Sequence, residues 1–423
     1  MKTAQMLLAA LLAFLPARHA LAEDMPLTPA QVKKFASSCV QYLSFKHHPD
    51  GVAKREKILK EMAEYEQYSW KGLRKALASA NNKPFLPPFK GKSRVTLRFP
   101  PQGIETCTFE LSTPAGIAPG KPAPLAVLLH GGGRGVGEGS QIMSLLGPSF
   151  QKRGCILAAP TVPPDCVWAE PKSEAFVTAI IWEICASYPV DPDRIYVAGH
   201  SMGGVGAWSF GTRFPSLFAG FGAAAGNPPN VMDYDLFHNT PFYVVHGSND
   251  VQVSPDMDIA AQKAVDALDP KPLAFHFDFF QADDDRGHGF PHKKIEEMAS
   301  FLASRSREMF VKRAVCTAPF AQVTEGVRDK FHAFWLGIDE RPYKGKAVGE
   351  IAESNLLRIR TQSVSKICVF VSDDFLDLSR NIAVEIDGRK AFDGKVKRSV
   401  KFMLDHMEET QDRGRVFANV VRP

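Results

Sequence analysis

The stretch IYVAGHSMGGVGAW, residues 195–208, decides which fold this chain is expected to adopt. Its first half is an apolar run typical of a buried strand, and a helix is expected to begin directly after Ser201. A turn this sharp strains the backbone at the serine and needs small neighbours, which Gly199, Gly203 and Gly204 supply. Two interpretations stay open here: Ser201 is an exposed nucleophile, or it is only a small residue in a tight turn.

The sequence around this stretch alternates apolar β-rich runs with helical runs. Antiparallel strands are expected at 93–99 and 105–113. Buried parallel strands are predicted at 123–130, 155–160, 194–200 and 241–247, followed by a last strand at 273–280. Helices are predicted between them, at 139–154, 172–188, 203–214, 256–268 and 292–309. Regular alternation of this kind predicts βαβ units in an α/β domain with a doubly wound, mostly parallel sheet, which we place at 91–309.

The first 90 residues have a different pattern. Residues 1–22 combine a positive start, a short apolar stretch and a small-residue cleavage site, as a secretory signal peptide does. An uncleaved membrane anchor is the alternative, although the apolar stretch is short for a span. Residues 23–90 form a helical N-terminal segment, with Thr28 and Pro29 as its expected cap and three prolines at its end.

The last part of the chain, 310–423, is predicted to be a small β-rich module. Strands are expected at 356–362, 366–373 and 382–394, and Asp387-Gly388 is typical of a hairpin turn. Three roles stay open for this module: binding a polymer, supporting a lid or mediating assembly. Phe331, Phe334, Trp335 and Tyr343 are candidates for polymer binding, but large aromatic residues of this kind are expected in the core.

Composition limits the classes of function. The chain has 423 residues, 23% of them charged, and a formal net charge of +5. It has no basic stripe interleaved with aromatic residues, so nucleic-acid binding has no support. Its seven cysteines form no C-x-x-C pair, which disfavours a metal centre, and their odd number leaves at least one outside any intrachain disulfide. The disulfide pairing cannot be deduced, and no metal or organic cofactor is implied.

Two further residues give Ser201 the partners that a nucleophilic serine needs. A hydroxyl is a weak nucleophile without a base, and the base must be oriented by a carboxylate. In hydrolases of this topology, the acid and the histidine follow the serine along the chain. Asp250 lies in the loop after the strand at 241–247, and His288 lies on a glycine-flanked loop before the last helix. This order predicts a triad at the carboxyl ends of the parallel strands.

Other acids and histidines nearby fit structural roles better. Asp256 and Asp258 lie at an expected helix start, where the helix dipole favours a negative charge. His246 and His276 lie in or at the end of strands, as satisfied core or loop histidines do. His292 opens the last helix and is expected to cap it.

Backbone N–H groups are available to stabilise a developing oxyanion. Met202 follows the serine at the start of a helix, so its N–H is free of an intrahelical partner. The strand at 123–130 ends in a glycine cluster, where a second set of donors is expected. His130 precedes the nucleophile and is expected to be structural, and Trp168 is predicted to line the substrate cleft.

Four motifs together resemble a known family: LLHGGGRG, VAGHSMGGVGAW, HGSND and GHGF. They are similar to those of the secreted α/β-hydrolases that include polyhydroxyalkanoate depolymerases, feruloyl and acetylxylan esterases, and predicted peptidases related to prolyl oligopeptidases. The resemblance covers about residues 91–306. It implies Ser201 as nucleophile, Asp250 as orienting acid and His288 as base. The backbone of Met202, Gly131 and Gly132 would form the oxyanion hole.

The sequence therefore predicts an exported serine hydrolase, secreted or periplasmic, that forms an acyl-enzyme on Ser201. Its expected substrate is a carboxylic ester, either an acyl group on a plant polysaccharide or a polyester. Two alternatives remain: a serine peptidase of the prolyl-oligopeptidase type, and an inactive hydrolase fold that binds carbohydrate or another surface. No membrane span is expected after signal cleavage.

Overall fold

The computed structural model describes most of the chain after residue 25. The described ranges are 26–45, 50–68, 70–78, 91–97, 106–118, 121–229, 232–283, 286–289, 291–318, 331–340, 345–353, 355–410, 412 and 414–423. The signal peptide predicted at 1–22 lies outside them. Within them, every helix is too short or too polar to cross a membrane.

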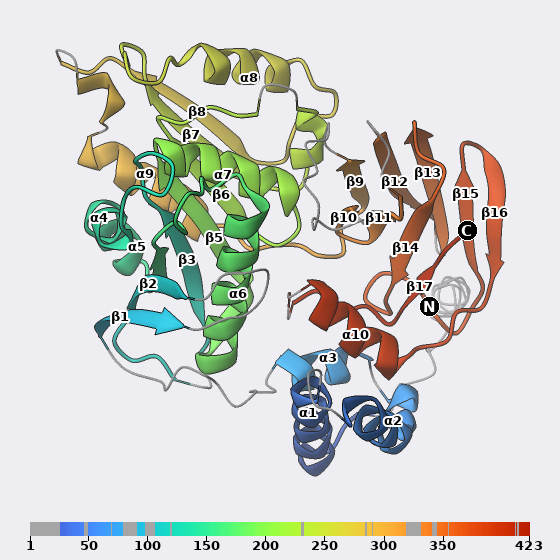
Figure 1. Ribbon diagram of the computed structural model, residues 1–423. Coiled ribbons are helices and arrows are strands. Elements are labelled where there is room, and N and C mark those ends of the chain that lie inside the picture. The colour runs from blue at the N-terminus through green and yellow to red at the C-terminus, as the bar shows by residue number, and fades with distance from the viewer. Residues whose placement is uncertain are drawn as a thin grey trace, which may run out of the picture.

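The middle of the chain forms an eight-stranded sheet (Figure 1). Its strands are β1 (Lys92–Leu97), β2 (Cys107–Ser112), β3 (Ala123–Leu129), β4 (Ile156–Pro160), β5 (Val190–His200), β6 (Gly220–Ala224), β7 (Phe242–Gly247) and β8 (Phe275–Phe280). Their order in the sheet is β1-β2-β4-β3-β5-β6-β7-β8. Strand β2 is antiparallel to its neighbours, and β3 to β8 are mutually parallel. This order and these directions are those of the α/β-hydrolase fold, so the predicted fold class is confirmed.

Helices cover both faces of this sheet. On one face pack α4 (Gly139–Leu145), α5 (Gly147–Gln151) and α9 (His292–Ala303). On the other face pack α6 (Pro171–Ser187), α7 (Met202–Arg213) and α8 (Asp256–Asp266). Strand β3 shows why two layers are needed, because Leu125 and Val127 join one core and Ala126 and Leu128 join the other.

Strand β6 was not predicted from the sequence. It reads GFGAA, and glycine and alanine have low β propensity. The strand forms because β5 and β7 supply hydrogen bonds on both sides, and because it is fully buried. A Cβ on Gly222 would lie 2.6 Å from the Met298 sulfur, so the small residues make room for α9.

The described residues before β1 and after α9 form a second domain. Its helices are α1 (Pro29–Ser44), α2 (Gly51–Met62), the 3₁₀-helix η1 (Ala63–Gln67), α3 (Trp70–Ala78) and α10 (Val400–Thr410). One sheet contains β10 (Phe331–Ala333), β11 (Leu336–Ile338), β14 (Ile367–Val371) and β17 (Asn419–Val421). The other contains β9 (Arg313–Ala318), β12 (Gly345–Glu353), β13 (Leu356–Gln362), β15 (Ile382–Ile386) and β16 (Arg389–Gly394).

Several local predictions for this domain agree with the structure. Thr28 caps α1 through a capping box with Gln31. Asp387 and Gly388, both at positive φ, turn β15 into β16. Helix α10 was not predicted, since the sequence indicated only strands in this module.

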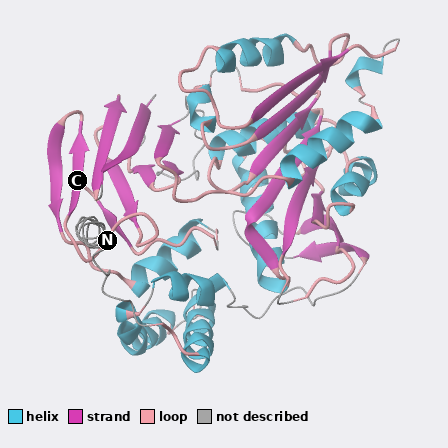
Figure 2. Cartoon of the chain, turned by 180° about the vertical axis from the view of Figure 1, so that it is seen from behind, coloured by secondary structure: helices cyan, strands magenta, loops and turns pink. Residues whose placement is uncertain are grey.

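The sequence predicts two separate units, the N-terminal helices and the C-terminal module. In the structure, these two segments share one hydrophobic core. Phe35, Tyr65 and Trp70 from the N-terminal helices are buried in the same cluster as Trp335 and Phe417. Helix α10 lies beside α1 and α2, below the two sheets in Figure 1. Figure 2 shows the molecule from behind, with this mixed domain beside the hydrolase sheet. The hydrolase domain therefore lies between two sequence segments that fold together.

Candidate active site

Ser201 lies where β5 ends and α7 begins. Its backbone has φ 58° and ψ −122°, and residues other than glycine rarely adopt a positive φ. Close packing holds it there: a Cβ on Gly203 would lie 2.0 Å from the carbonyl oxygen of Leu129 in β3. Any larger residue at 203 would push the helix away from the sheet. The hydroxyl consequently projects from a fixed turn at the carboxyl ends of the parallel strands.

The structure brings His288 and Asp250 to this serine. His288 Nε2 lies 2.9 Å from Ser201 Oγ, and His288 Nδ1 lies 2.8 Å from Asp250 Oδ2. Because a carboxylate only accepts hydrogen bonds, Nδ1 carries the proton and Nε2 is free to accept from the serine hydroxyl. The three side chains therefore form a continuous hydrogen-bond chain in the arrangement that activates a serine.

Asp250 is buried, yet it is held as a carboxylate. Burial alone would raise its pKa, but hydrogen bonds from the Val253 N–H, the His288 ring and the Gln252 N–H outweigh burial and lower the pKa below the ordinary value. The two backbone donors lie 2.9 and 2.8 Å from Oδ1. The other oxygen, Oδ2, is left for His288, so both the charge and the direction of the acid are fixed.

His200 is a further residue of the site that the sequence analysis did not identify. Its Nε2 lies 2.7 Å from the backbone oxygen of His288, and that oxygen can only accept, so the ring donates. Burial lowers the pKa of His200. A neutral ring next to the nucleophile thus anchors the backbone of the base. Its place immediately before Ser201 was the available signal.

Two of the three predicted oxyanion donors, Met202 and Gly131, lie next to the serine. Met202 is the first residue of α7, where the backbone N–H has no intrahelical acceptor. The backbone of Gly131 passes beside Ser201, since a Cβ on Gly131 would lie 3.1 Å from the serine Cβ. Gly132 follows with φ 132°, a conformation that only glycine adopts readily.

His130 fixes the loop that carries these glycines. Its Nε2 accepts the Val162 N–H at 3.0 Å, so Nδ1 holds the proton and donates to the Gly131 oxygen at 2.8 Å. Burial lowers the pKa of His130, in keeping with this neutral tautomer. His130 is fully buried and acts as a brace for the loop, as its structural interpretation from the sequence expected.

Trp168 is in a different place from the one the sequence suggested. Its side chain has no exposed surface, and its indole N–H donates to the His130 oxygen at 2.9 Å. A residue with no exposed surface cannot contact substrate, so the prediction that Trp168 lines the cleft is not supported. The ring packs beneath the glycine loop because α7 approaches it there without a side chain at Gly206.

A buried pair, His246 and Asp258, lies directly behind the acid. His246 Nδ1 is 2.7 Å from Asp258 Oδ2, and His246 Nε2 is 3.3 Å from Asp250 Oδ2. The sequence analysis attributes the acid at 258 to the helix dipole. In the structure, its main partner is instead the His246 ring. Twelve residues separate the partners, and nothing local in the sequence indicates that α8 brings them together.

The described residues include one cluster with metal-ligating side chains. His332, Asp339 and Cys368 in the second domain place one ligand atom each within 4.8 Å of the others. Asp339 already accepts hydrogen bonds from the Arg422 guanidinium at 2.8 Å and the Cys368 thiol at 3.4 Å. The arginine balances the carboxylate charge, so these residues do not fit a cation well.

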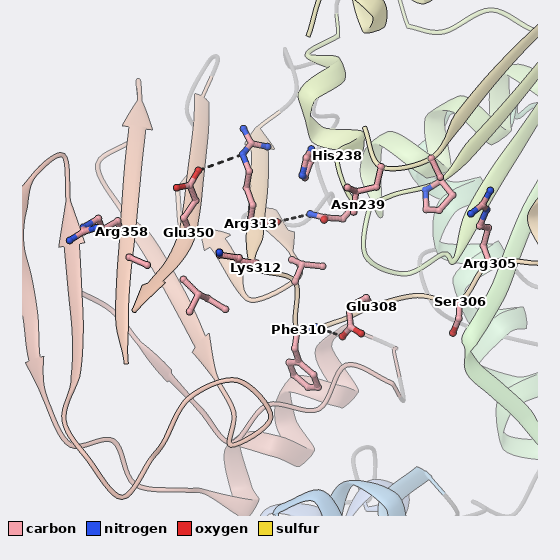
Figure 3. A pocket seen from close by; sticks show the side chains of 16 residues that line it. His238, Asn239, Arg305, Ser306, Glu308, Phe310, Lys312, Arg313, Glu350 and Arg358 are labelled. Carbon is pink, nitrogen blue, oxygen red and sulfur yellow. Dashed lines mark hydrogen bonds and ion pairs between the residues drawn. The ribbon is translucent and has the colours of Figure 1, made fainter. Parts of the chain in front are cut away.

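A cavity of about 920 Å³ opens between the two domains (Figure 3). Its lining includes His238 and Asn239 from the hydrolase domain, and Arg313, Glu350 and Arg358 from the second domain. None of the triad residues lines it. Arg313 pairs with Asp235 and Arg358 with Glu385, so much of its positive charge is already neutralised. The cavity is a seam between domains rather than part of the candidate active site.

None of the six described cysteines is in a disulfide, namely Cys39, Cys155, Cys166, Cys185, Cys316 and Cys368. Burial raises the pKa of Cys155 and of Cys316 to about 12 in each case. Thiols that stay protonated in this way are poor nucleophiles.

Comparisons with known proteins give partial likenesses. No family model matches the chain. A protein of Nocardia uniformis subsp. tsuyamanensis named "Putative esterase NocK" is 31% identical over 128 residues, which are 27% of this chain and 37% of that protein. A solved thermostable esterase is 26% identical, with a TM-score of 0.44 over 51% of this chain and 63% of that one. Esterase 2 of Thermogutta terrifontis is 17% identical, with a TM-score of 0.41 over 52% and 97%. The chain thus spans little more than a third of the curated relative's length.

Proposed function

We propose that this protein is a serine hydrolase that cleaves carboxylic esters through an acyl-enzyme on Ser201. The observation that carries the proposal is the hydrogen-bond chain from Ser201 through His288 to Asp250, with the serine at positive φ. The partial likeness to a protein named as an esterase supports the same class of substrate.

Each residue of the site has a definite role in this reaction. His288 Nε2 takes the hydroxyl proton as Ser201 Oγ attacks the ester carbonyl, and Asp250 stabilises the imidazolium that forms. The N–H groups of Met202 and of the Gly131–Gly132 loop stabilise the tetrahedral oxyanion. His288 then protonates the leaving alcohol. Water, activated by the same base, releases the acid and restores Ser201.

We further propose that the substrate is bulky, such as an acylated polysaccharide or a polyester. Two apolar side chains next to catalytic loops are highly exposed: Val136, after the glycine loop, at 62%, and Val251, after the acid, at 80%. Exposed apolar residues beside polar catalytic groups suit an extended surface better than a small enclosed molecule. We also propose that the protein is exported, on the basis of the signal-like residues 1–22. The intact mass of protein secreted by the native host would reveal their removal.

The test is labelling of the folded protein with a fluorophosphonate probe, followed by peptide mapping and by assays on matched ester and peptide panels. We expect one adduct, on the peptide that contains Ser201, and turnover of esters. Ser201→Ala should abolish the adduct and lower kcat by several orders of magnitude. Ser209→Ala, in the same helix, is the matched control and should behave as the wild type. Peptide turnover without ester turnover would favour the peptidase alternative, and no adduct on folded protein would favour the inactive binding protein.

A further inference from the structure

His246 is a buried histidine whose two ring nitrogens both face hydrogen-bond acceptors. The side chain lies at the end of β7 with no exposed surface. Its Nδ1 faces Asp258 Oδ2 at 2.7 Å, and its Nε2 faces the Val253 carbonyl oxygen at 2.9 Å. A carbonyl oxygen can only accept, and so can a carboxylate. Both ring nitrogens are therefore expected to carry protons, which makes the ring an imidazolium.

This buried cation lies against the acid of the triad. His246 Nε2 is 3.3 Å from Asp250 Oδ2, the oxygen that accepts from His288 Nδ1 at 2.8 Å. The contact is shielded from water, because the side chains of His246, Asp250 and Asp258 have no exposed surface. Charges this close in a dry site interact far more strongly than they do in water.

Burial and charge act in opposite directions on this pair. Burial alone would lower the pKa of His246, but its bonds to Asp258 and Val253 and the charge of Asp250 outweigh burial and raise the pKa above the ordinary value. Burial also raises the pKa of Asp258, against the effects of His246 and Trp208. An isolated carboxylate or imidazolium would be costly at either position, so the two charges depend on each other.

We propose that His246, held as an imidazolium by Asp258, is a positioning residue that keeps the Asp250 carboxylate ionised and directed at His288. The inference rests on the proposed function, because it assigns a role to residues behind the same triad. It extends the hydrogen-bonded and charged chain to five side chains, from Ser201 through His288, Asp250 and His246 to Asp258.

Other titratable groups also face this pair. His200, at the end of β5, is neutral and contributes no charge. Tyr234, in the 3₁₀-helix η3 (Tyr234–Phe237), faces Asp258, and burial raises its pKa to about 12, so it too is neutral. The negative charges that balance a cation at His246 are thus those of Asp250 and Asp258. The base, His288, is a further titratable group next to Asp250.

The pH dependence of catalysis separates this role from simple packing. In His246→Gln the amide keeps much of the volume but removes the positive charge. Without that charge, Asp250 attracts a proton on the His288 ring more strongly, so the acid limb of the kcat/KM profile should move to higher pH. We expect a shift of roughly half a unit to one unit, because the rings of His246 and His288 face the same oxygen of Asp250, at 3.3 and 2.8 Å. The plateau value should fall by about tenfold or more.

Two further variants sharpen the test. Asp258→Asn offers the ring an N–H donor in place of a carboxylate, so the ring can become neutral, and the acid limb should shift in the same direction. In the double variant, the acid limb should shift no further than in His246→Gln alone, because both single changes remove the same positive charge, the one on His246. Val244→Ala, a buried change in the same strand, is the control: it should lower the melting temperature but leave the acid limb in place.

A second readout does not need activity. In wild-type protein carrying ¹⁵N-labelled histidine, the His246 signals, identified by their loss in His246→Gln, should show both ring nitrogens protonated at pH 8. A ring with an unprotonated nitrogen, or an acid limb that stays in place in His246→Gln while the wild type turns over ester, would overturn the role of His246. Failure of the wild type to form any fluorophosphonate adduct would instead refute the proposed function, whatever the ring signals show.

Discussion

At the scale of single residues, the site depends on backbone positions more than on unusual side chains. Ser201 is held at positive φ by close packing of its glycine neighbours, and the glycine loop proposed to bind the oxyanion turns through Gly132 at φ 132°. His130 and His200 are both neutral rings that donate to backbone oxygens, of Gly131 and His288 respectively. The reactive groups are thus placed by hydrogen bonds from side chains to main-chain oxygens.

Gly132→Ala tests the oxyanion loop. A Cβ there would lie 2.3 Å from the Val136 oxygen in a backbone conformation that alanine rarely adopts, so the loop must move. We expect kcat/KM for esters to fall by about 10- to 1,000-fold, as it does when an oxyanion donor is lost. Gly133→Ala, where an added Cβ meets nothing within 4 Å, is the control and should stay within about threefold of the wild type. Equal losses in both variants would count against a specific role for Gly132.

At the scale of secondary-structure elements, α9, the helix that follows the His288 loop, is held to the α5 region by a single glutamate. Glu296 in α9 accepts from Ser149 at 2.8 Å, Lys152 at 2.9 Å and Arg153 at 2.9 Å, all at the end of α5. These hydrogen bonds, Lys152 first, lower the pKa of Glu296 to about 2. One side chain therefore ties together α5 and α9, two of the three helices on that face of the sheet.

Glu296→Gln should reduce stability in a pH-dependent way. The folded pKa is below the ordinary value of 4.5, so the contribution of this carboxylate is present above about pH 4.5 and is lost as the pH falls toward 2. Urea unfolding at pH 7 and pH 3 should show a larger deficit for the variant at pH 7. Glu297→Gln, whose partners Lys293 and Lys294 lie on the same helix, should show a smaller deficit at pH 7. A Glu296→Gln deficit that is independent of pH would contradict this account.

The elements that the sequence predicts are those whose local pattern agrees with their environment. The buried parallel strands read as apolar runs, and the serine turn is marked by its glycines, so the fold and the order of the triad could be predicted. Strand β6 could not, because its Gly-Ala sequence forms a strand only between two existing neighbours. The contact between His246 and Asp258, and the burial of Trp168, depend on how α8 and α7 pack, which no local pattern indicates.

At the scale of the whole molecule, the two domains are joined by a buried arginine. Arg307 lies after α9 with 1% of its side chain exposed. It donates to Asp412 at 2.6 Å in the second domain, and to the Ser216 oxygen at 2.7 Å and Asp193 at 3.2 Å in the hydrolase domain. A cation placed in this way fixes the relative position of the domains, because the buried Asp412 carboxylate loses its guanidinium partner if they separate.

Arg307→Met should leave the buried Asp412 carboxylate without its cation, at a cost of about 3–5 kcal/mol. Calorimetry should show a lower melting temperature and, if the domains lose their coupling, two transitions in place of one. Arg358→Met, which removes an exposed pair with Glu385 within the second domain, should cost less than about 1 kcal/mol. If both variants unfold like the wild type, the buried arginine does not hold the domains together.

The shared core of the second domain has a consequence for how the protein is made. Helices α1 to α3 leave the ribosome first, but the strands and α10 that cover their apolar faces are synthesised last. The hydrolase domain, which is continuous in sequence, can fold in the interval, while the first helices wait with Phe35, Tyr65 and Trp70 uncovered. A chain that ends before α10 would therefore contain a folded hydrolase domain together with N-terminal helices whose apolar faces are exposed. Quality control would then recognise such a chain by the uncovered helices α1 to α3 rather than by its missing end.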